Sequence, residues 1–150
     1  MKRHLALHPL SREHHQALVL ARRLERADTA EEREAARALW RRYWTGFLAD
    51  HVRAEERWLG PLLERHGGAA LASRLAHEHG ELEAGGEGLE LEDWPERCSQ
   101  LGDRLRRHVR WEERELFPWL EARASEVELE TLARGLDEDT RGASCALPES

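Results

Sequence analysis

The sequence predicts an all-α protein, an antiparallel up-down-up-down four-helix bundle with a short C-terminal fifth helix. Its 150 residues are 40% apolar and 35% charged, and they are rich in Ala, Leu, Glu and Arg, which favour helices. Val, Ile, Thr and Tyr, which suit strands, are scarce. Apolar residues recur at spacings of three and four along four long segments. Short connections join these segments, so consecutive helices are expected to pack as antiparallel neighbours.

The first two helices have recognisable starts and stops. An apolar stripe predicts a first helix at about 11–27. The second begins near Thr29, where Thr29-Ala30-Glu31-Glu32 has the pattern of a capping box, and Gly67-Gly68 is expected to stop it. Pro61 lies near its end, where a proline kinks or ends a helix.

A third helix is expected at about 69–90. Three glycines weaken its second half, since each costs about 1 kcal/mol relative to Ala inside a helix. These are Gly85, Gly86 and Gly88. Either a frayed end or close packing against a neighbour is expected there.

The fourth helix follows Asp93-Trp94-Pro95, and Pro118 falls near its end, in the place equivalent to Pro61. Ser125-Glu126-Val127-Glu128 has the pattern of a second capping box and opens the fifth helix, which is expected to run to about Leu136. We therefore expect one bundle domain over 1–136 and a flexible tail over 137–150, because the tail is polar and rich in small residues.

Composition also excludes several classes of protein. The net charge is -7 and no basic stripe is present, which argues against nucleic acid as a partner. No apolar run approaches 18 residues, so no membrane segment is expected. Cys98 and Cys145 lie far apart and are expected to be reduced thiols of a cytoplasmic protein.

A histidine and carboxylate motif occurs twice in the chain. His51 and Glu55 are followed by Pro61 in the same way that His108 and Glu112 are followed by Pro118. A His and a Glu four residues apart lie on one face of a helix, one turn from each other, where they can bind a common ion. Each copy therefore predicts half of a metal site.

The repeat extends to a preceding helix, since Glu13-His14 comes before the first copy and Glu78-His79 before the second. A pseudo-twofold axis between the two halves would bring these histidines and glutamates to one level of the core. Ionised carboxylates in an apolar core need strong compensation, which two divalent cations would supply. The predicted metal ligands are His14, His51, Glu55, His79, His108 and Glu112.

Helical phase separates these residues from their neighbours but leaves alternatives open. His15 and His77 are the alternatives to His14 and His79, and Glu56 and Glu113 are alternatives to the carboxylates that precede them. Glu83 is either a further ligand or part of the helix rim. The three remaining histidines fit no apolar stripe and are expected at the surface: His4, His8 and His66.

Six tryptophans are mostly expected to fill the core. Two of them, Trp44 and Trp58, share the predicted inner face of the second helix with His51. We expect these two to form a dry lining that protects a bound oxygen species from water.

On these motifs the chain resembles the hemerythrin-like (HHE cation-binding) domain family over about residues 7–123. The resemblance implies a four-helix bundle holding two iron ions in a non-haem di-iron centre, with bridging carboxylates and an oxo or hydroxo bridge. The chain has Glu112 at four residues from His108 and Glu83 one turn beyond His79. The oxygen-carrying invertebrate members usually have an aspartate five residues after the corresponding histidine, and a second histidine one turn beyond the position of His79. The chain is therefore more similar to the bacterial branch, linked to oxygen, nitric oxide or iron sensing and storage.

The expected function is that of a small cytoplasmic protein that binds, stores or senses dioxygen, a related ligand such as nitric oxide or peroxide, or iron. The alternative is a di-iron enzyme of oxidative or nitrosative stress defence, acting as an oxidase, a peroxidase or an iron-centre repair protein. Binding or sensing is favoured over catalysis. A separate redox or regulatory protein is the expected protein partner, with no nucleic acid and no membrane involved.

Overall fold

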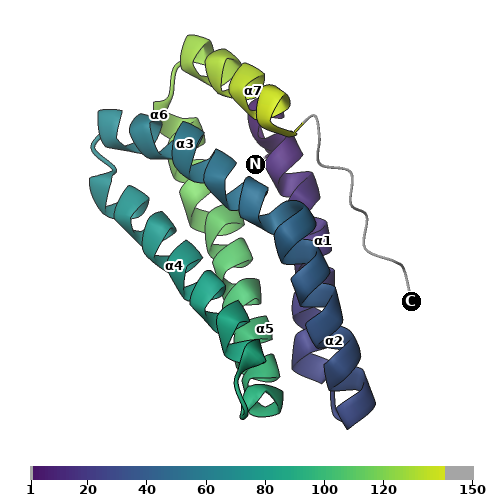
Figure 1. The fold of residues 1–150 in the computed structure, drawn as a ribbon. Coiled ribbons are helices and arrows are strands. Elements are labelled where there is room, and N and C mark those ends of the chain that lie inside the picture. Colours follow the sequence, from purple (N-terminus) through teal and green to yellow (C-terminus); the bar gives the residue numbers. More distant parts are fainter. Residues whose placement is uncertain (1, 141–150) are drawn as a thin grey trace.

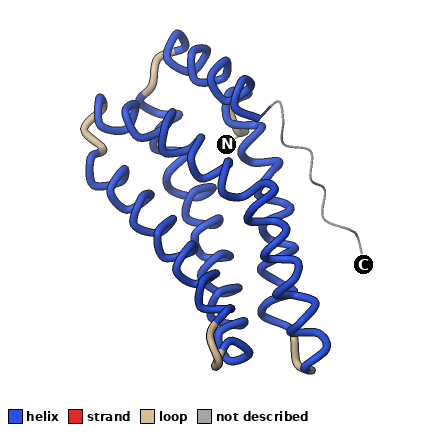
Figure 2. The backbone as a smooth tube through the Cα atoms, in the orientation of Figure 1, coloured by secondary structure: helices blue, strands red, loops and turns tan. Residues whose placement is uncertain are grey.

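The computed structural model describes residues 2–140, which are mostly helical, with short connections and no strand (Figures 1 and 2). The elements are η1 (Leu5–Leu7), α1 (His8–Arg26), α2 (Ala30–Tyr43), η2 (Trp44–Leu48), α3 (Ala49–Arg65), α4 (Ala69–Glu87), η3 (Gly88–Glu90), α5 (Trp94–Trp111), η4 (Glu112–Leu116), α6 (Phe117–Arg123) and α7 (Glu126–Thr140). Because α2, η2 and α3 are continuous, as are α5, η4 and α6, the described chain folds into four long helical segments and a shorter one. The all-helical prediction is confirmed, and these segments pack as a helical bundle.

Local sequence signals set the ends of these helices. Thr29 Oγ1 accepts a hydrogen bond from the Glu32 N–H at 3.0 Å, and the Glu32 carboxylate accepts one from the Thr29 N–H, which confirms the first capping box. Ser125 and Glu128 form the same reciprocal pair at the start of α7. After α3, Gly67 takes a φ of 84°, a conformation that only glycine adopts readily, so the helix stops where the sequence predicted.

The two prolines, each expected to kink or end its helix in an equivalent place, differ in their local backbone. Pro61 lies inside α3, which continues to Arg65. Pro118 follows η4, a π-helical turn in which the Phe117 N–H donates to the Glu112 carbonyl. A π turn accommodates one extra residue, so the chain stays helical past Pro118 as well. Neither proline ends its helix, since α3 continues to Arg65 and α6 continues to Arg123.

Close packing explains the glycines near the end of α4. A Cβ placed on Gly86 would lie 2.3 Å from Trp40 Nε1, so only glycine admits this tryptophan against α4. Gly102 plays the same role between α5 and α1, where a Cβ would lie 2.6 Å from the Ala21 carbonyl oxygen. The helix therefore does not fray at these glycines but approaches its neighbours closely there.

The helix α7 lies across one end of the bundle, beside α3 and η1 (Figure 1). It extends past the predicted end at Leu136 to Thr140, and Asp139 accepts a hydrogen bond from Trp58 Nε1 at 2.6 Å. The first residues expected in a flexible tail are therefore helical and attached to α3, while 141–150 lie outside the described residues. No described helix is both long enough and apolar enough to span a bilayer.

Candidate metal centre

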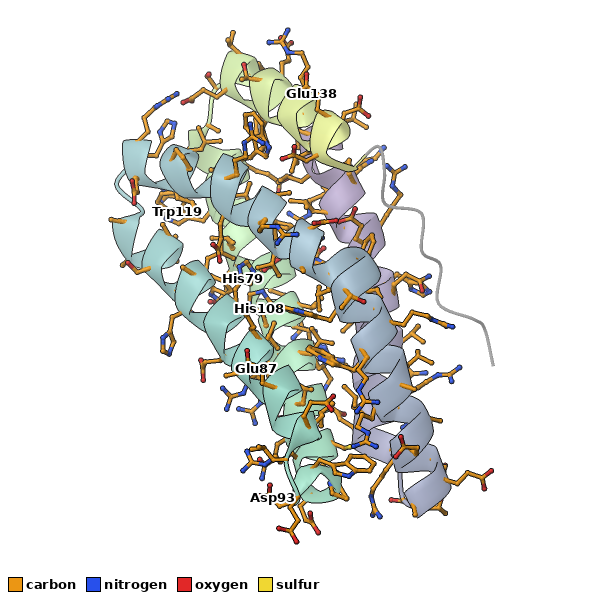
Figure 3. All side chains as sticks on the ribbon, in the orientation of Figure 1. His79, Glu87, Asp93, His108, Trp119 and Glu138 are labelled. Carbon is orange, nitrogen blue, oxygen red and sulfur yellow. The ribbon has the colours of Figure 1, made fainter. Side chains whose placement is uncertain are left out.

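The six predicted ligands meet at one level in the middle of the bundle. His14 comes from α1, His51 and Glu55 from α3, His79 from α4, and His108 with Glu112 from the junction of α5 and η4. All six are buried, with at most 5% of each residue exposed. Figure 3 shows His79 and His108 at this level, well away from both ends of the helices. The six predicted ligands are the only buried polar or charged residues in the part of the chain that the structure describes.

This polar layer divides the apolar core into two clusters. One cluster, with Leu20 and Leu105, fills the core near the α1–α2 connection. The other, with Leu10 and Leu63, fills the end that α7 covers. Apolar packing above and below the layer keeps water from the six side chains. Their interactions with one another are therefore strong, because the local dielectric is low.

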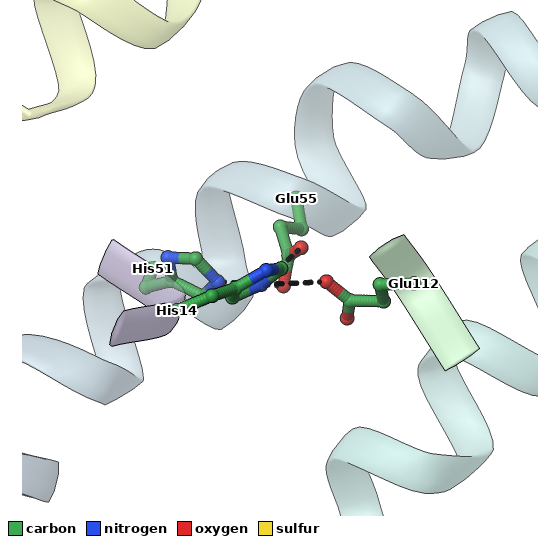
Figure 4. A group of neighbouring side chains, drawn as sticks. All are labelled: His14, His51, Glu55 and Glu112. Atoms are coloured by element: carbon green, nitrogen blue, oxygen red, sulfur yellow. Dashed lines mark ion pairs between the residues drawn. The ribbon is translucent and has the colours of Figure 1, made fainter. Parts of the chain in front are cut away.

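The two carboxylates are shared between two pairs of histidines. Figure 4 shows both carboxylates with the first pair, His14 and His51. In the first pair, His14 Nε2 lies 2.9 Å from Glu112 Oε2, and His51 Nε2 lies 3.1 Å from Glu55 Oε1. In the second pair, His79 Nε2 lies 3.2 Å from Glu55 Oε1, and His108 Nε2 contacts Glu112. Within each group of two histidines and two carboxylates, one donor atom per residue lies within 4.8 Å of all the others. This arrangement can hold two metal ions side by side, with both carboxylates available to each ion.

The central atoms lie within ion-pair distance of one another, but several of them form no well-aligned hydrogen bond among the described residues. Both carboxylate oxygens of Glu55 and of Glu112 are in this state, as are Nε2 of His14 and Nε2 of His79. Burying an ionised carboxylate costs several kcal/mol unless a cation, either a protonated histidine or a metal ion, lies beside it. The atoms that face the centre are thus those that a pair of cations would satisfy, and the residues fit a dinuclear metal site.

The Nδ1 atom of each of these four histidines contacts a further glutamate. His14 Nδ1 lies 2.7 Å from Glu113, and His51 Nδ1 contacts Glu13. The other two contacts are His79 with Glu56 at 2.9 Å and His108 with Glu78 at 2.8 Å. A carboxylate only accepts, so the Nδ1–H donates and the Nε2 lone pair points to the centre.

Sequence reasoning missed the role of these four glutamates. Glu56 and Glu113 were alternatives for direct ligation, but they contact the outer side of histidines instead. The sequence signal was adjacency, since Glu13 and Glu78 directly precede predicted ligands and Glu56 and Glu113 directly follow them. A neighbouring residue on a helix projects about 100° away, toward the next helix, which is where each partner histidine lies.

The other open alternatives lie outside the cluster. His15 and Glu83 are exposed, and His77 is exposed and forms an ion pair with Glu81. The phase of the apolar stripe therefore chose the inward residue correctly at both positions. Two of the remaining histidines lie at the α7 end and are partly exposed, where His4 contacts Glu126 and His66 contacts Glu128. Arg65 also pairs with Glu128, and Arg3 pairs with Glu121.

The protonation of the site is dominated by its carboxylates. Burial lowers the pKa of each central histidine, but the neighbouring carboxylates outweigh burial. The pKa is raised to about 9 at His14, about 10 at His51 and about 11 at His79, and it is also raised at His108. Burial raises the pKa of Glu112, but His108 and the other contacts outweigh this and hold the pKa well below its usual range. Without metal, the centre is a set of ion pairs.

A small cavity of about 10 Å³ lies against the centre, large enough for about one water-sized molecule. Its apolar wall is formed by Ala17, Tyr43, Leu48, Val52, Leu82, Leu105 and Val109. Trp44 and Trp58 do not line it, so the tryptophan lining expected from the sequence is wrong. Trp44 stacks on Trp40, and Trp58 is directed to Asp139 on α7. The broad helical stripe could not distinguish residues at the level of the site from residues one or two turns away.

Comparison with protein families agrees with this geometry. Residues 5–120 match the model of the hemerythrin HHE cation binding domain, which covers every residue of the centre and excludes α7. Searches of curated proteins and of solved structures gave no match. The match spans most of the chain and includes both copies of the histidine and carboxylate motif. The chain therefore belongs to the hemerythrin HHE cation-binding domain family.

Proposed function

We propose that this protein holds two non-haem iron ions and uses them to bind, store or sense dioxygen or a related small ligand such as nitric oxide or peroxide. The observation that carries the proposal is the sharing of Glu55 and Glu112 between two pairs of histidines. Mixed imidazole and carboxylate donors suit iron, and bridging carboxylates are typical of di-iron bundles. His14 and His51 would hold one ion, and His79 and His108 the other. Iron would supply a reversible change of oxidation state and an open position for a ligand.

The size of the cavity supports a small ligand. A space of about 10 Å³ with an apolar wall has the size of about one water molecule, so it supports a very small ligand at the centre and excludes a larger substrate. The proposal includes the antiparallel up-down-up-down order of the bundle, which would relate the two halves of the centre by a pseudo-twofold axis. It also includes a cytoplasmic location and a separate redox or regulatory protein as partner.

One feature favours the enzymatic alternative. A surface cleft of about 440 Å³ between α4 and α5 is lined by Glu78, Arg74 and His108, among other residues. Through this cleft a separate electron donor could approach a predicted ligand closely. Repeated peroxide consumption with a reductant present would identify an enzyme, whereas a single stoichiometric reaction would identify a binding protein.

The proposal is tested by reconstituting the metal-free protein anaerobically with ferrous iron and then admitting air. We expect about two irons per chain, from one ion for each histidine pair, and charge-transfer absorption after oxidation. Adjacent residues provide matched controls. His79→Ala and Glu112→Ala should lower iron content strongly, and His77→Ala should leave it unchanged. Glu113→Ala should weaken affinity about 10–100-fold and keep binding at saturating iron. Wild-type protein that binds no iron would overturn the proposal.

A further inference from the structure

The four outer glutamates form a closed ring around the bundle. Glu13 on α1 contacts His51 on α3, and Glu56 on α3 contacts His79 on α4. Glu78 on α4 contacts His108 on α5, and Glu113 on η4, which continues α5, contacts His14 on α1. Each long helical segment thus supplies one carboxylate to the histidine of the next, and the last returns to the first. This order connects all four segments through charged contacts at the level of the centre.

The ring makes the surroundings of the centre strongly negative. The four outer glutamates and the two central ones supply six carboxylates within one layer of the bundle. Two arginines oppose them, since Arg3 pairs with Glu113 at 3.1 Å and Arg74 pairs with Glu78 at 2.6 Å. Glu13 and Glu56 have no arginine partner among the described residues. With neutral histidines as ligands, the six carboxylates outnumber these arginines by four charges.

We propose that Glu13, Glu56, Glu78 and Glu113 are positioning residues that lower the reduction potential of the metal pair and thereby favour its oxidised state. The inference rests on the proposed function, because it requires a redox-active metal at the centre. A carboxylate that accepts from Nδ1–H makes the imidazole a stronger donor and places negative charge near the metal. Both effects stabilise the higher positive charge of an oxidised ion.

The four glutamates differ in exposure and in whether an arginine pairs with them, so we expect them to lower the reduction potential by different amounts. The Glu13 side chain is 14% exposed and unopposed by arginine, so its charge is screened least. The Glu56 side chain is 42% exposed, and water screens its charge more. Replacing Glu by Gln keeps an oxygen that accepts from Nδ1–H and removes only the charge. Glu13→Gln should therefore raise the potential more than Glu56→Gln.

The test is an anaerobic titration of the iron-loaded protein with redox dyes. The charge-transfer absorption of the protein reports the oxidation state of the iron at each step. In each step the dye gives one electron to a ferric ion, which becomes ferrous. Glu13→Gln should lower the ferric-to-ferrous ratio at a fixed potential about tenfold, which corresponds to about 59 mV for a one-electron couple. Glu83→Gln, on the exposed side of α4, is the matched control and should leave the ratio unchanged.

A change of opposite sign keeps the test decisive if Glu13→Gln fails to fold. Arg74→Gln removes the positive charge beside Glu78 and should lower the potential, whereas Glu56→Gln should raise it. General damage to the fold would not move the two variants in opposite directions. Iron content is measured on every sample. Wild-type protein without iron would overturn the proposed function. Iron-loaded variants with the wild-type potential would overturn the ring proposal alone.

Discussion

Adjacent residues in this protein have very different surroundings. Glu112 is fully buried at the centre, while the side chain of its neighbour Glu113 is 28% exposed and pairs with Arg3. One step along a helix rotates a side chain by about 100°, which is enough to move a carboxylate from the centre to the outer side of a histidine. The pair thereby provides one predicted central ligand and one outer contact from two identical residues.

Protonation of the central histidines predicts how the stability of the metal-free protein depends on pH. Their folded pKa values of about 9 to 11 exceed the unfolded value of 6.5, so the folded state holds more protons between these limits. The stabilisation is complete below about pH 6.5 and is lost as the pH rises through the folded pKa values. The free energy of unfolding should fall by about 1.4 kcal/mol per pH unit for each histidine that is protonated only in the folded state.

Urea unfolding of metal-free protein between pH 6.5 and 10 measures this dependence. The free energy of unfolding should fall steadily across the range. Metal-loaded protein is the comparison, because a bound ion displaces the Nε2 proton and should remove the decline. A free energy of unfolding that stays constant or rises in the metal-free protein would contradict the assignment.

At the scale of elements, α1 and α5 approach closely because of Gly102. Gly102→Ala would place a Cβ 2.6 Å from the Ala21 carbonyl oxygen and 2.9 Å from the Glu25 backbone nitrogen, and backbone atoms cannot yield without moving a helix. We expect a loss of about 1–3 kcal/mol in the free energy of unfolding, measured by urea denaturation. Gly80→Ala on α4 is the control, because its Cβ would meet nothing within 4 Å. That variant should gain about 0.5–1 kcal/mol, and equal effects of the two changes would contradict the packing argument.

The helix α7 contributes to stability but supplies none of the predicted ligands. Leu129, Leu132 and Leu136 are buried in the apolar cluster at its end of the bundle. Leu132→Ala should lower the free energy of unfolding by about 2–5 kcal/mol, because it leaves a cavity there. Iron content measured at 10 °C should stay at the wild-type value. Thr131→Ala, at the exposed neighbouring position, should change the free energy of unfolding by no more than about 0.5 kcal/mol. Its iron content should also stay at the wild-type value.

At the scale of the whole molecule, the bundle is an apolar core interrupted by one charged layer. The clusters on both sides of the layer stabilise the fold without metal, while the layer itself consists of groups that are costly to bury unless they pair with each other or with cations. Apolar packing therefore holds the four segments in place, and the charged contacts fix their rotation. The apolar clusters therefore supply stability that offsets the cost of burying the charged layer.

Most of the fold was predictable from the sequence because its signals are local. The capping boxes at Thr29 and Ser125 fixed helix starts, and Gly67 fixed a stop. The spacing of apolar residues along each helix identified His14 and His79 as inward residues, beside the exposed His15 and His77. The sequence was misleading at the end of α7, where a contact with α3 accompanies a helix that runs past Leu136 to Thr140.

The sequence by itself determined the helices and the six inward side chains, since both follow from the spacing of residues along one helix. Only the tertiary structure decided which glutamate contacts which histidine, because each of these contacts joins two different segments. It also decided that Tyr43, Leu48 and their apolar neighbours, rather than Trp44 and Trp58, line the cavity. Distance along one helix axis is encoded locally, but the level at which two helices meet is set by the packing of the entire core.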